Sequence, residues 1–335
     1  MDKLIAIIAL MFLLSCENIG PRGYKYEQGS LPDSPVNLEL FNSEYDDYNS
    51  TAPSLGRLIP FCFSTNRNSQ GGNFDIIYQP MNVNFDKTSG VLKVTNDYAN
   101  WSIFISEYGI IQNAMNKINT SGNEFGPYLT YYQNTGFVDS DFLLLYASDL
   151  SGDFEISYTF NKDQSAFSEA KPVMFLNSEF NDLYPSFNAD FSKIYFCSDR
   201  DNGNFDIFYV YISKTDKEII KVLSDSSYKE VFKEEALSGD YDDKCPYIFG
   251  NMLIFSSNRP GGYGGFDLYY SKFENEKWST PTNFGSKINS PFNEYRPIIF
   301  DEEVDFEKDM MVFSSDRTGG KGGFDLYFVG VEKTD

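Results

Sequence analysis

A repeated pattern of strand, glycine turn and strand constrains this chain more than any other feature. Residues 251–271 read NMLIFSSNRPGGYGGFDLYYS: an apolar run, a Ser-Ser-Asn-Arg corner, a glycine-rich turn and a Phe-Asp-Leu-Tyr exit. Residues 310–328, MMVFSSDRTGGKGGFDLYF, repeat it almost letter for letter. Weaker copies lie at residues 61–78, 143–158 and 194–209. Self-similarity of this kind is the sequence signature of a repeat architecture.

The spacing between copies suits one four-stranded unit per copy. The acids that follow the glycine turns are 80, 51, 61 and 58 residues apart, in the order Asp75, Glu155, Asp206, Asp267 and Asp325. Before each copy, an acid or amide pair precedes a short apolar strand, usually with a proline between them, as in residues 288–300, INSPFNEYRPIIF. The strand before each glycine turn is almost continuously apolar, so both its faces must be covered. The sequence therefore predicts an all-β fold, a β-propeller of four-stranded blades.

The long first interval leaves the blade number open. Five copies predict five blades, but residues 81–108 are either a long hairpin insertion or a sixth, degenerate blade. No stretch shows a helical period over more than about two turns, and the best candidate is residues 230–237, EVFKEEAL. Because the chain ends soon after the third strand of the last copy, we expect residues 35–41 to complete the last blade and close the ring.

The repeats resemble a known family. The proline-led strand, apolar strand, Ser-Asx-Arg corner, glycines and Phe-Asp-Leu/Ile-Tyr exit resemble the WD40-like repeat of TolB-type propellers. Residues 278–297, WSTPTNFGSKINSPFNEYRP, are similar to repeats in envelope lipoproteins and OmpA-family proteins of Bacteroidetes-type bacteria. The resemblance covers about residues 35–329, and six-bladed TolB-type propellers favour a sixth blade. The second copy departs from the pattern, since Glu155 replaces Asp and Leu150 stands where the others carry Arg67, Arg200, Arg259 and Arg317.

The first residues indicate a processing signal. Lys3 precedes an apolar run, Leu4 to Leu14, that is too short to span a bilayer comfortably. It ends in LLSC, which resembles the bacterial lipobox and predicts lipid attachment at Cys16; a cysteine near the end of an ordinary signal peptide is the alternative. Residues 1–15 are thus the expected lipoprotein signal peptide, 16–34 a flexible Gly/Pro-rich tether, and 35–335 the propeller. We expect an outer-membrane lipoprotein of the cell envelope that meets the membrane only through its anchor.

Charge and cysteine content narrow the partners. With 27 Lys and Arg against 49 Asp and Glu, the net charge of −22 disfavours binding to nucleic acid and to anionic lipid surfaces.

Three further cysteines, Cys62, Cys197 and Cys245, cannot all pair with one another because their number is odd. Two of them lie in apolar strands, so we expect buried thiols. A disulfide between Cys197 and Cys245 is the alternative.

The chain has no histidine, which excludes Ser-His-Asp and Cys-His sites and His-ligated metals. No cofactor or metal is predicted, although residues 201–206 weakly resemble a calcium loop without its distal glutamate. A carboxylate pair of the glycosidase type is the remaining enzymatic option.

The repeated acids and arginines are interpreted as structural because one set occurs in each blade. This set comprises Arg67, Asp75, Glu155, Arg200, Asp206, Arg259, Asp267, Arg317 and Asp325. Aromatic residues at strand starts and turn tips could stack on sugars or contact a protein: Tyr45, Tyr48, Tyr131, Tyr132 and Tyr263.

The leading functional prediction is a lipid-anchored, non-enzymatic propeller that binds another envelope protein. The alternative is a glycan-binding protein or carboxylate-dependent glycoside hydrolase that acts at the propeller channel. Because the repeats are structural, the functional residues are expected among the parts that do not repeat.

Overall fold

The computed structural model describes residues 24–53, 58–97, 105–134, 140–163, 165–212, 218–300 and 306–333. The predicted signal peptide and Cys16 lie outside the described residues. Among those that are described, no helix is both long and apolar enough to cross a membrane.

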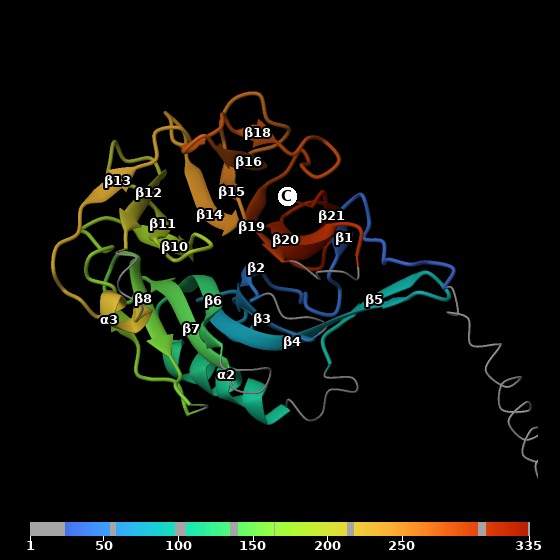
Figure 1. The fold of residues 1–335 in the computed structure, drawn as a ribbon, viewed down its shortest axis with the longest axis horizontal. Coiled ribbons are helices and arrows are strands. Elements are labelled where there is room, and N and C mark those ends of the chain that lie inside the picture. Colours follow the sequence, from blue (N-terminus) through green and yellow to red (C-terminus); the bar gives the residue numbers. More distant parts are fainter. Residues whose placement is uncertain are drawn as a thin grey trace, which may run out of the picture.

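Five antiparallel sheets surround a central axis, which confirms the predicted propeller and fixes five blades (Figure 1). Blade 1 consists of β2 (Asp47–Thr51), β3 (Leu58–Thr65), β4 (Asp75–Asp86) and β5 (Val91–Thr95). Blade 2 consists of β6 (Glu124–Asn134), β7 (Ser140–Ser148), β8 (Glu155–Phe160) and β9 (Lys171–Pro172). Blade 3 consists of β10 (Asp182–Phe187), β11 (Lys193–Ser198), β12 (Asp206–Tyr211) and β13 (Val231–Lys233).

Blade 4 consists of β14 (Asp243–Phe249), β15 (Met252–Ser257), β16 (Asp267–Glu274) and β17 (Lys277–Trp278), with β18 (Thr282–Asn283) also paired to β16. Blade 5 consists of β19 (Glu294–Phe300), β20 (Asp309–Ser315), β21 (Asp325–Val331) and β1 (Val36–Asn37). As predicted, the N-terminal strand closes the ring, with Val36 opposite Phe328.

The described part of residues 81–108 forms no sixth blade. β4 runs on to Asp86 and pairs with β5 in a long hairpin, which is the other interpretation that the sequence left open. The hairpin extends away from the ring in Figure 1. The resemblance to six-bladed TolB-type propellers misled on this point, because the additional residues lengthen blade 1 and form a helix.

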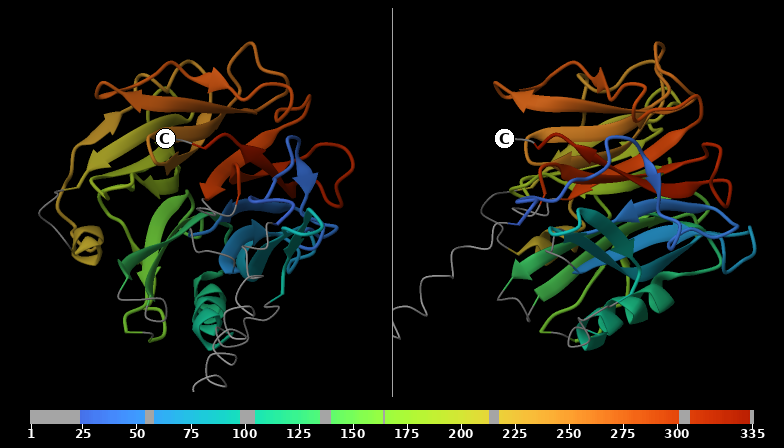
Figure 2. Two further views of the ribbon diagram at one scale, coloured as in Figure 1. Left: turned by 45° about the vertical axis from the view of Figure 1, so that its right-hand side comes forward. Right: turned by 90° about the vertical axis from the view of Figure 1, so that its right-hand side faces the viewer.

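The helix α2 (Ile105–Ile118) contradicts the expectation of no helix beyond about two turns. Its buried residues Ile111, Ala114, Met115 and Ile118 follow the i, i+3, i+4, i+7 spacing of an amphipathic helix. They join a core cluster with β4 and β7, and Figure 2 shows α2 on the outside of the ring. The candidate helix at 230–237 was wrong, since it contains β13; a short helix, α3 (Ile219–Leu223), lies upstream.

A side-chain carboxamide fastens each blade to the next. Asn42, Asn119, Asn177 and Asn289 each accept a 2.8 Å hydrogen bond from a backbone N–H of the adjacent blade. Each also donates its Nδ2 to the C=O of that same residue, at 2.9–3.1 Å. The amide thus replaces a ladder partner for Leu326, Ile76, Ile156 and Leu268. Between blades 3 and 4, Ser238 makes the same two contacts with Ile207 at 3.1 and 3.4 Å.

Replacing Asn289 by alanine should lower the free energy of unfolding by about 1–3 kcal/mol, because the buried N–H of Leu268 then loses its partner, whereas its C=O still accepts the Phe284 N–H. Denaturant unfolding measures this loss. Asn289→Ser, which copies the contact at Ser238, should recover part of it. A loss below about 0.5 kcal/mol for Asn289→Ala would show that apolar packing alone sets the blade angle.

Candidate functional site

Aromatic side chains gather around the axis on the face that carries the glycine turns. They come from the second residue of the innermost strands and from the phenylalanine before each third strand. Ring centroids of the contacting pairs lie 4.6–6.4 Å apart, for example in Tyr48–Phe125, Tyr48–Tyr295 and Phe266–Tyr295. We call this set the axial aromatic arc; its members are half-buried: Tyr48, Phe74, Phe125, Phe154, Phe205, Phe266, Tyr295 and Phe324.

Lys244 interrupts the aromatic pattern in blade 4. It occupies the second position of β14, where three other blades carry Tyr48, Phe125 and Tyr295. Its Nζ lies 4.2 Å from the Phe205 ring centroid and 5.3 Å from that of Phe266, so it joins the two rings by cation–π contacts. It also forms an ion pair with Asp242 at 3.2 Å.

One carboxylate per blade lies beside the arc, paired with an asparagine. The Asn side chain donates to the carboxylate in four blades, at 2.7–3.1 Å, and in blade 4 Asn258 accepts from the Asp242 N–H. One member of each pair also accepts the N–H of an arc phenylalanine, at 2.7–3.2 Å. We call these half-buried acids the axial carboxylates: Asp46, Asp149, Asp199, Asp242 and Asp316.

The axis below the arc is filled by side chains. The third residue of every innermost strand sits at a β-bulge with positive φ, between 46° and 60°. Four of these residues are not glycine, and each such conformation costs about 1–3 kcal/mol. The five residues are Asn49, Gly126, Tyr184, Cys245 and Arg296.

Contacts across the axis close it. Asn49 of blade 1 reaches the Tyr184 hydroxyl of blade 3 at 3.4 Å, and the Arg296 guanidinium of blade 5 lies 5.6 Å from the Tyr184 ring centroid. Non-adjacent blades can touch only at the centre, so these residues plug it. A ligand therefore meets the axial face and not an open channel, which corrects the location predicted for the glycan alternative.

The repeated arginines hold buried acids that the sequence analysis did not single out. Arg67, Arg200 and Arg259 form ion pairs of 2.5–2.6 Å with the acid that begins the innermost strand of their own blade, and Arg317 does so at 3.0 Å. Each arginine also donates to the backbone carbonyl of the residue six positions before this acid. The acids have no exposed surface: Asp47, Asp182, Asp243 and Glu294.

Burial raises the pKa of Asp182, Asp243 and Glu294, and the arginines oppose this effect. The partners are 16 to 23 residues apart. The shared acid before each apolar strand was the signal that could have identified them.

The acids after the glycine turns lie elsewhere. Asp267 and Asp325 accept backbone N–H groups of their turns, and Asp75 accepts the Asn68 amide. Asp206 shares the Lys233 ammonium with Asp201, so the loop resembling a calcium site is bridged by a lysine. Glu155 begins β8. These acids and the arginines are therefore not brought together at one point.

The remaining candidates are scattered. Of the five tyrosines, Tyr48 belongs to the arc, Tyr131 packs on Phe142, and Tyr263 is half exposed at a turn tip. Tyr45 lies against Gly71, and Tyr132 donates to the Asn161 carbonyl at 2.6 Å. Cys62, Cys197 and Cys245 are free and buried, so the disulfide alternative is not realised.

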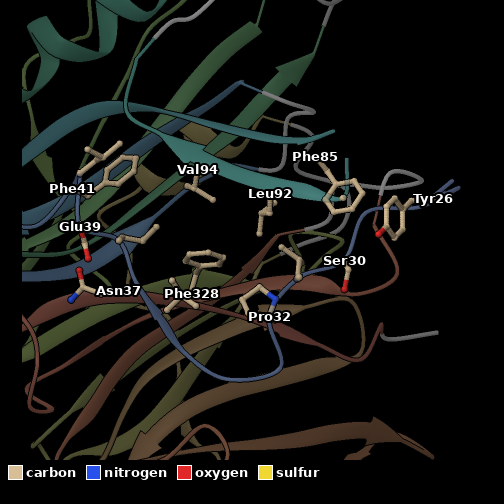
Figure 3. Close-up of a pocket in the computed structure, with 15 residues that line it drawn as sticks. Tyr26, Ser30, Pro32, Asn37, Glu39, Phe41, Phe85, Leu92, Val94 and Phe328 are labelled. Atoms are coloured by element: carbon tan, nitrogen blue, oxygen red, sulfur yellow. The ribbon is translucent and has the colours of Figure 1, made fainter. Parts of the chain in front are cut away.

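A side groove of about 620 Å³ lies between the ring-closing segment and the blade 1 hairpin. Figure 3 shows Phe85, Leu92 and Val94 of the hairpin facing Pro32 and Phe328 across it. Its lining is mostly apolar, and the polar side chains among the residues that line it are Ser30, Asn37, Glu39 and Tyr26. It lies at the outer edge of the ring, apart from the axial face.

The corner of blade 2 lacks its arginine. Glu124 is fully buried and accepts hydrogen bonds from Thr120 and Ser148, but Leu150, which is 59% exposed, stands where the other blades have arginine. Burial raises the pKa of Glu124 more than these hydrogen bonds lower it. The folded protein thus binds this proton more tightly than the unfolded chain, so stability falls as the pH rises from the ordinary glutamate pKa of 4.5 through the raised folded value.

Leu150→Arg should supply the missing counter-charge and stabilise the fold by about 1.5 kcal/mol at pH 7. The gain should disappear as the pH falls and Glu124 becomes protonated. Chemical denaturation as a function of pH measures it. Glu124→Gln is the control: in that background Leu150→Arg should add nothing, and an equal gain there would refute the proposed pair.

Comparisons with known proteins gave matches of fold only. No family model and no curated protein matches the sequence. A GH43 protein, BlXynB from Bacillus licheniformis, matches with a TM-score of 0.51 and 11% identity, over 90% of this chain and 55% of that one. The chain thus spans about half the length of that protein. The catalytic domain of a GH62 alpha-L-arabinofuranosidase from Coprinopsis cinerea matches with a TM-score of 0.47 and 10% identity, over 91% of this chain and 96% of that domain.

These matches correct the leading functional prediction. The sequence predicted a non-enzymatic propeller that binds an envelope protein, but a solved propeller that the chain resembles, with a TM-score of 0.51, is a GH43 protein and not a TolB-type one. The prediction of a non-enzymatic, protein-binding propeller is therefore corrected, and the glycan alternative remains. At 11% identity, what the likeness shows directly is the five-bladed fold.

Proposed function

We propose that this protein is a carbohydrate-active propeller that holds a saccharide on its axial face. The observation that carries the proposal is the axial aromatic arc, a band of half-buried rings bordered by carboxylates over a closed floor. Aromatic faces supply large, rigid contact area, and a few fixed polar groups orient a ligand. The likeness in fold to the GH43 protein supports this class of ligand.

The arc is richest in polar groups between blades 4 and 5. Burial raises the pKa of the Tyr295 phenol, and the Cys245 thiol and the carboxylates of Asp242 and Asp316 raise it further, so its hydroxyl stays protonated and can donate to a sugar oxygen. Lys244 is held there by Asp242 and two aromatic rings. A ligand seated here would contact rings, a hydroxyl donor, an ammonium and two carboxylates.

Carboxylates beside the arc also meet the chemical requirement of glycoside hydrolysis, which uses one acid to protonate the leaving oxygen and a second as base or nucleophile. The absence of histidine does not affect this chemistry. We assign Asp242 and Asp316 as the first pair to test, because they are the axial carboxylates of the adjacent blades 4 and 5, where the arc is richest in polar groups.

A panel of neutral polysaccharides and oligosaccharides, assayed by calorimetry and by release of reducing ends, tests the proposal. Tyr48→Ala and Phe125→Ala should weaken binding at least tenfold by removing arc surface. Asp242→Asn or Asp316→Asn should reduce turnover by about 10²-fold or more with little effect on binding. Tyr263→Ala, which alters a half-exposed tyrosine outside the arc, is the matched control. Equal binding by Tyr48→Ala and Tyr263→Ala would contradict a site on the arc.

We also propose that the chain is a lipoprotein of the bacterial cell envelope, related to TolB-type repeat proteins. The LLSC sequence at Cys16 and the repeated SSDR and FDLY elements support this assignment. Neither a partner protein nor nucleic acid is part of the proposal.

Expression in a lipoprotein-processing bacterium with labelled palmitate should yield a labelled band. Cys16→Ala should abolish the label, because the thiol is the attachment point of the diacylglycerol. Cys62→Ala, which removes a buried thiol, should leave it intact. Label that persists in Cys16→Ala would refute the anchor.

A further inference from the structure

Arg296 is a fully buried cation on the propeller axis, without an anionic partner. Its guanidinium has no exposed surface. It donates to the carbonyl of Pro127 at 3.0 Å and, with a long contact of 3.4 Å, to that of Pro246. Its Nε has no hydrogen-bond partner. In the described part of the chain, no carboxylate lies within ion-pair distance of it, whereas each arginine of the blade corners has one.

The ionisable groups that face Arg296 are all neutral near pH 7. They are the phenols of Tyr128, Tyr184 and Tyr247 and the thiols of Cys245 and Cys197. Burial raises the pKa of each, that of Cys245 to about 11 in spite of the adjacent guanidinium. An arginine does not lose its proton in a protein, and a buried charge is normally paired. The positive charge is therefore uncompensated by the side chains around it.

A second orphaned group lies on the same plug. Among the described residues, the Oδ1 of the fully buried Asn49 has no hydrogen-bond partner, and its Nδ2 makes only the 3.4 Å contact with Tyr184. The orientation of a carboxamide is set by its hydrogen bonds, so a half-turn would present the N–H₂ group in place of Oδ1. Asn49 and Arg296 both lie against Tyr184, and both adopt positive φ. Strained residues with unmet hydrogen bonds at one place are typical of a binding site.

We propose that the axis binds a small monovalent anion of chloride size, held by the Arg296 Nε–H. Water could satisfy the N–H but would leave the charge unpaired. A carboxylate-bearing ligand would need an opening to this depth, and Arg296, Asn49 and Cys245 have none. The anion neutralises the guanidinium and ties the innermost strands together at the centre. This site lies beneath the axial face, and its assignment does not depend on the proposed glycan function.

Thermal unfolding of the full chain in sodium chloride and in sodium gluconate at equal ionic strength tests the proposal. Gluconate is too bulky for the axis, so the comparison removes the general screening expected for a chain with a net charge of −22. The Tm should rise with chloride and not with gluconate, by on the order of 3 °C per tenfold increase above the dissociation constant. Equal Tm values in the two salts across the range would overturn the site.

Variants and an anomalous scatterer locate the anion. Arg296→Gln should abolish the difference between the two salts, whereas Arg259→Gln, which breaks a corner ion pair, should lower Tm but keep the difference. Cys245→Ser should also keep it; a chloride effect that appears only in Cys245→Ser would identify the thiolate as the native counter-ion and overturn the proposal. If Arg296→Gln does not fold, anomalous diffraction from crystals of the unaltered protein soaked in bromide tests the site instead. An anomalous peak beside Arg296 is expected, and its absence there would refute the site.

Discussion

The carboxamide clasp between blades is the interaction on which the rest of this structure depends. Apolar burial holds blades face to face, but it is not directional and leaves their relative angle free. An asparagine that bonds both backbone groups of one residue in the adjacent third strand fixes angle and register together. The clasp is preserved where β1 completes blade 5, so the ring is closed by the same chemistry that joins its interior blades. The residues on the axial face are positioned by this angle and register between the blades.

The buried acid that follows each clasp explains the repeated arginine. A carboxylate at the start of the innermost strand accepts N–H and hydroxyl groups from the loop before it, as Asp182 does from Ser178 and Glu294 from Ser290. These bonds do not offset the loss of hydration, since burial remains the largest influence on the pKa of both acids. The arginine supplies the counter-charge and also satisfies a loop carbonyl. Blade 2 folds without it, which shows that the arginine contributes stability to a corner whose geometry is set by hydrogen bonds.

The blades and their closure could be predicted from the sequence because a propeller repeats its local chemistry at a fixed spacing. The helix α2 was missed although Ile111, Ala114, Met115 and Ile118 carry its period, because it falls in a region expected to be all strand. The sequence did not identify the acids that the arginines bind, because Asp243 precedes its partner Arg259 by 16 residues and meets it only through pairing of β14 with β15. The closed axis could not be predicted. It depends on a β-bulge at which bulky residues such as Tyr184 adopt positive φ, and no residue type in the sequence signals this conformation.

Position within the innermost strand separates structural from functional residues in this fold. The first residue is an acid in all five blades and is bound to its corner. The second and third residues differ between blades, and in blade 5 they are Tyr295 and Arg296. The second lies at the axial face and the third plugs the axis, so both can vary without disturbing the clasp or the corner. A closed floor confines a ligand to the face, where contact area is limited to the arc and its bordering acids. In the proposed saccharide site, binding energy would come from stacking and from fixed polar groups, and the plug residues form the floor beneath the aromatic arc.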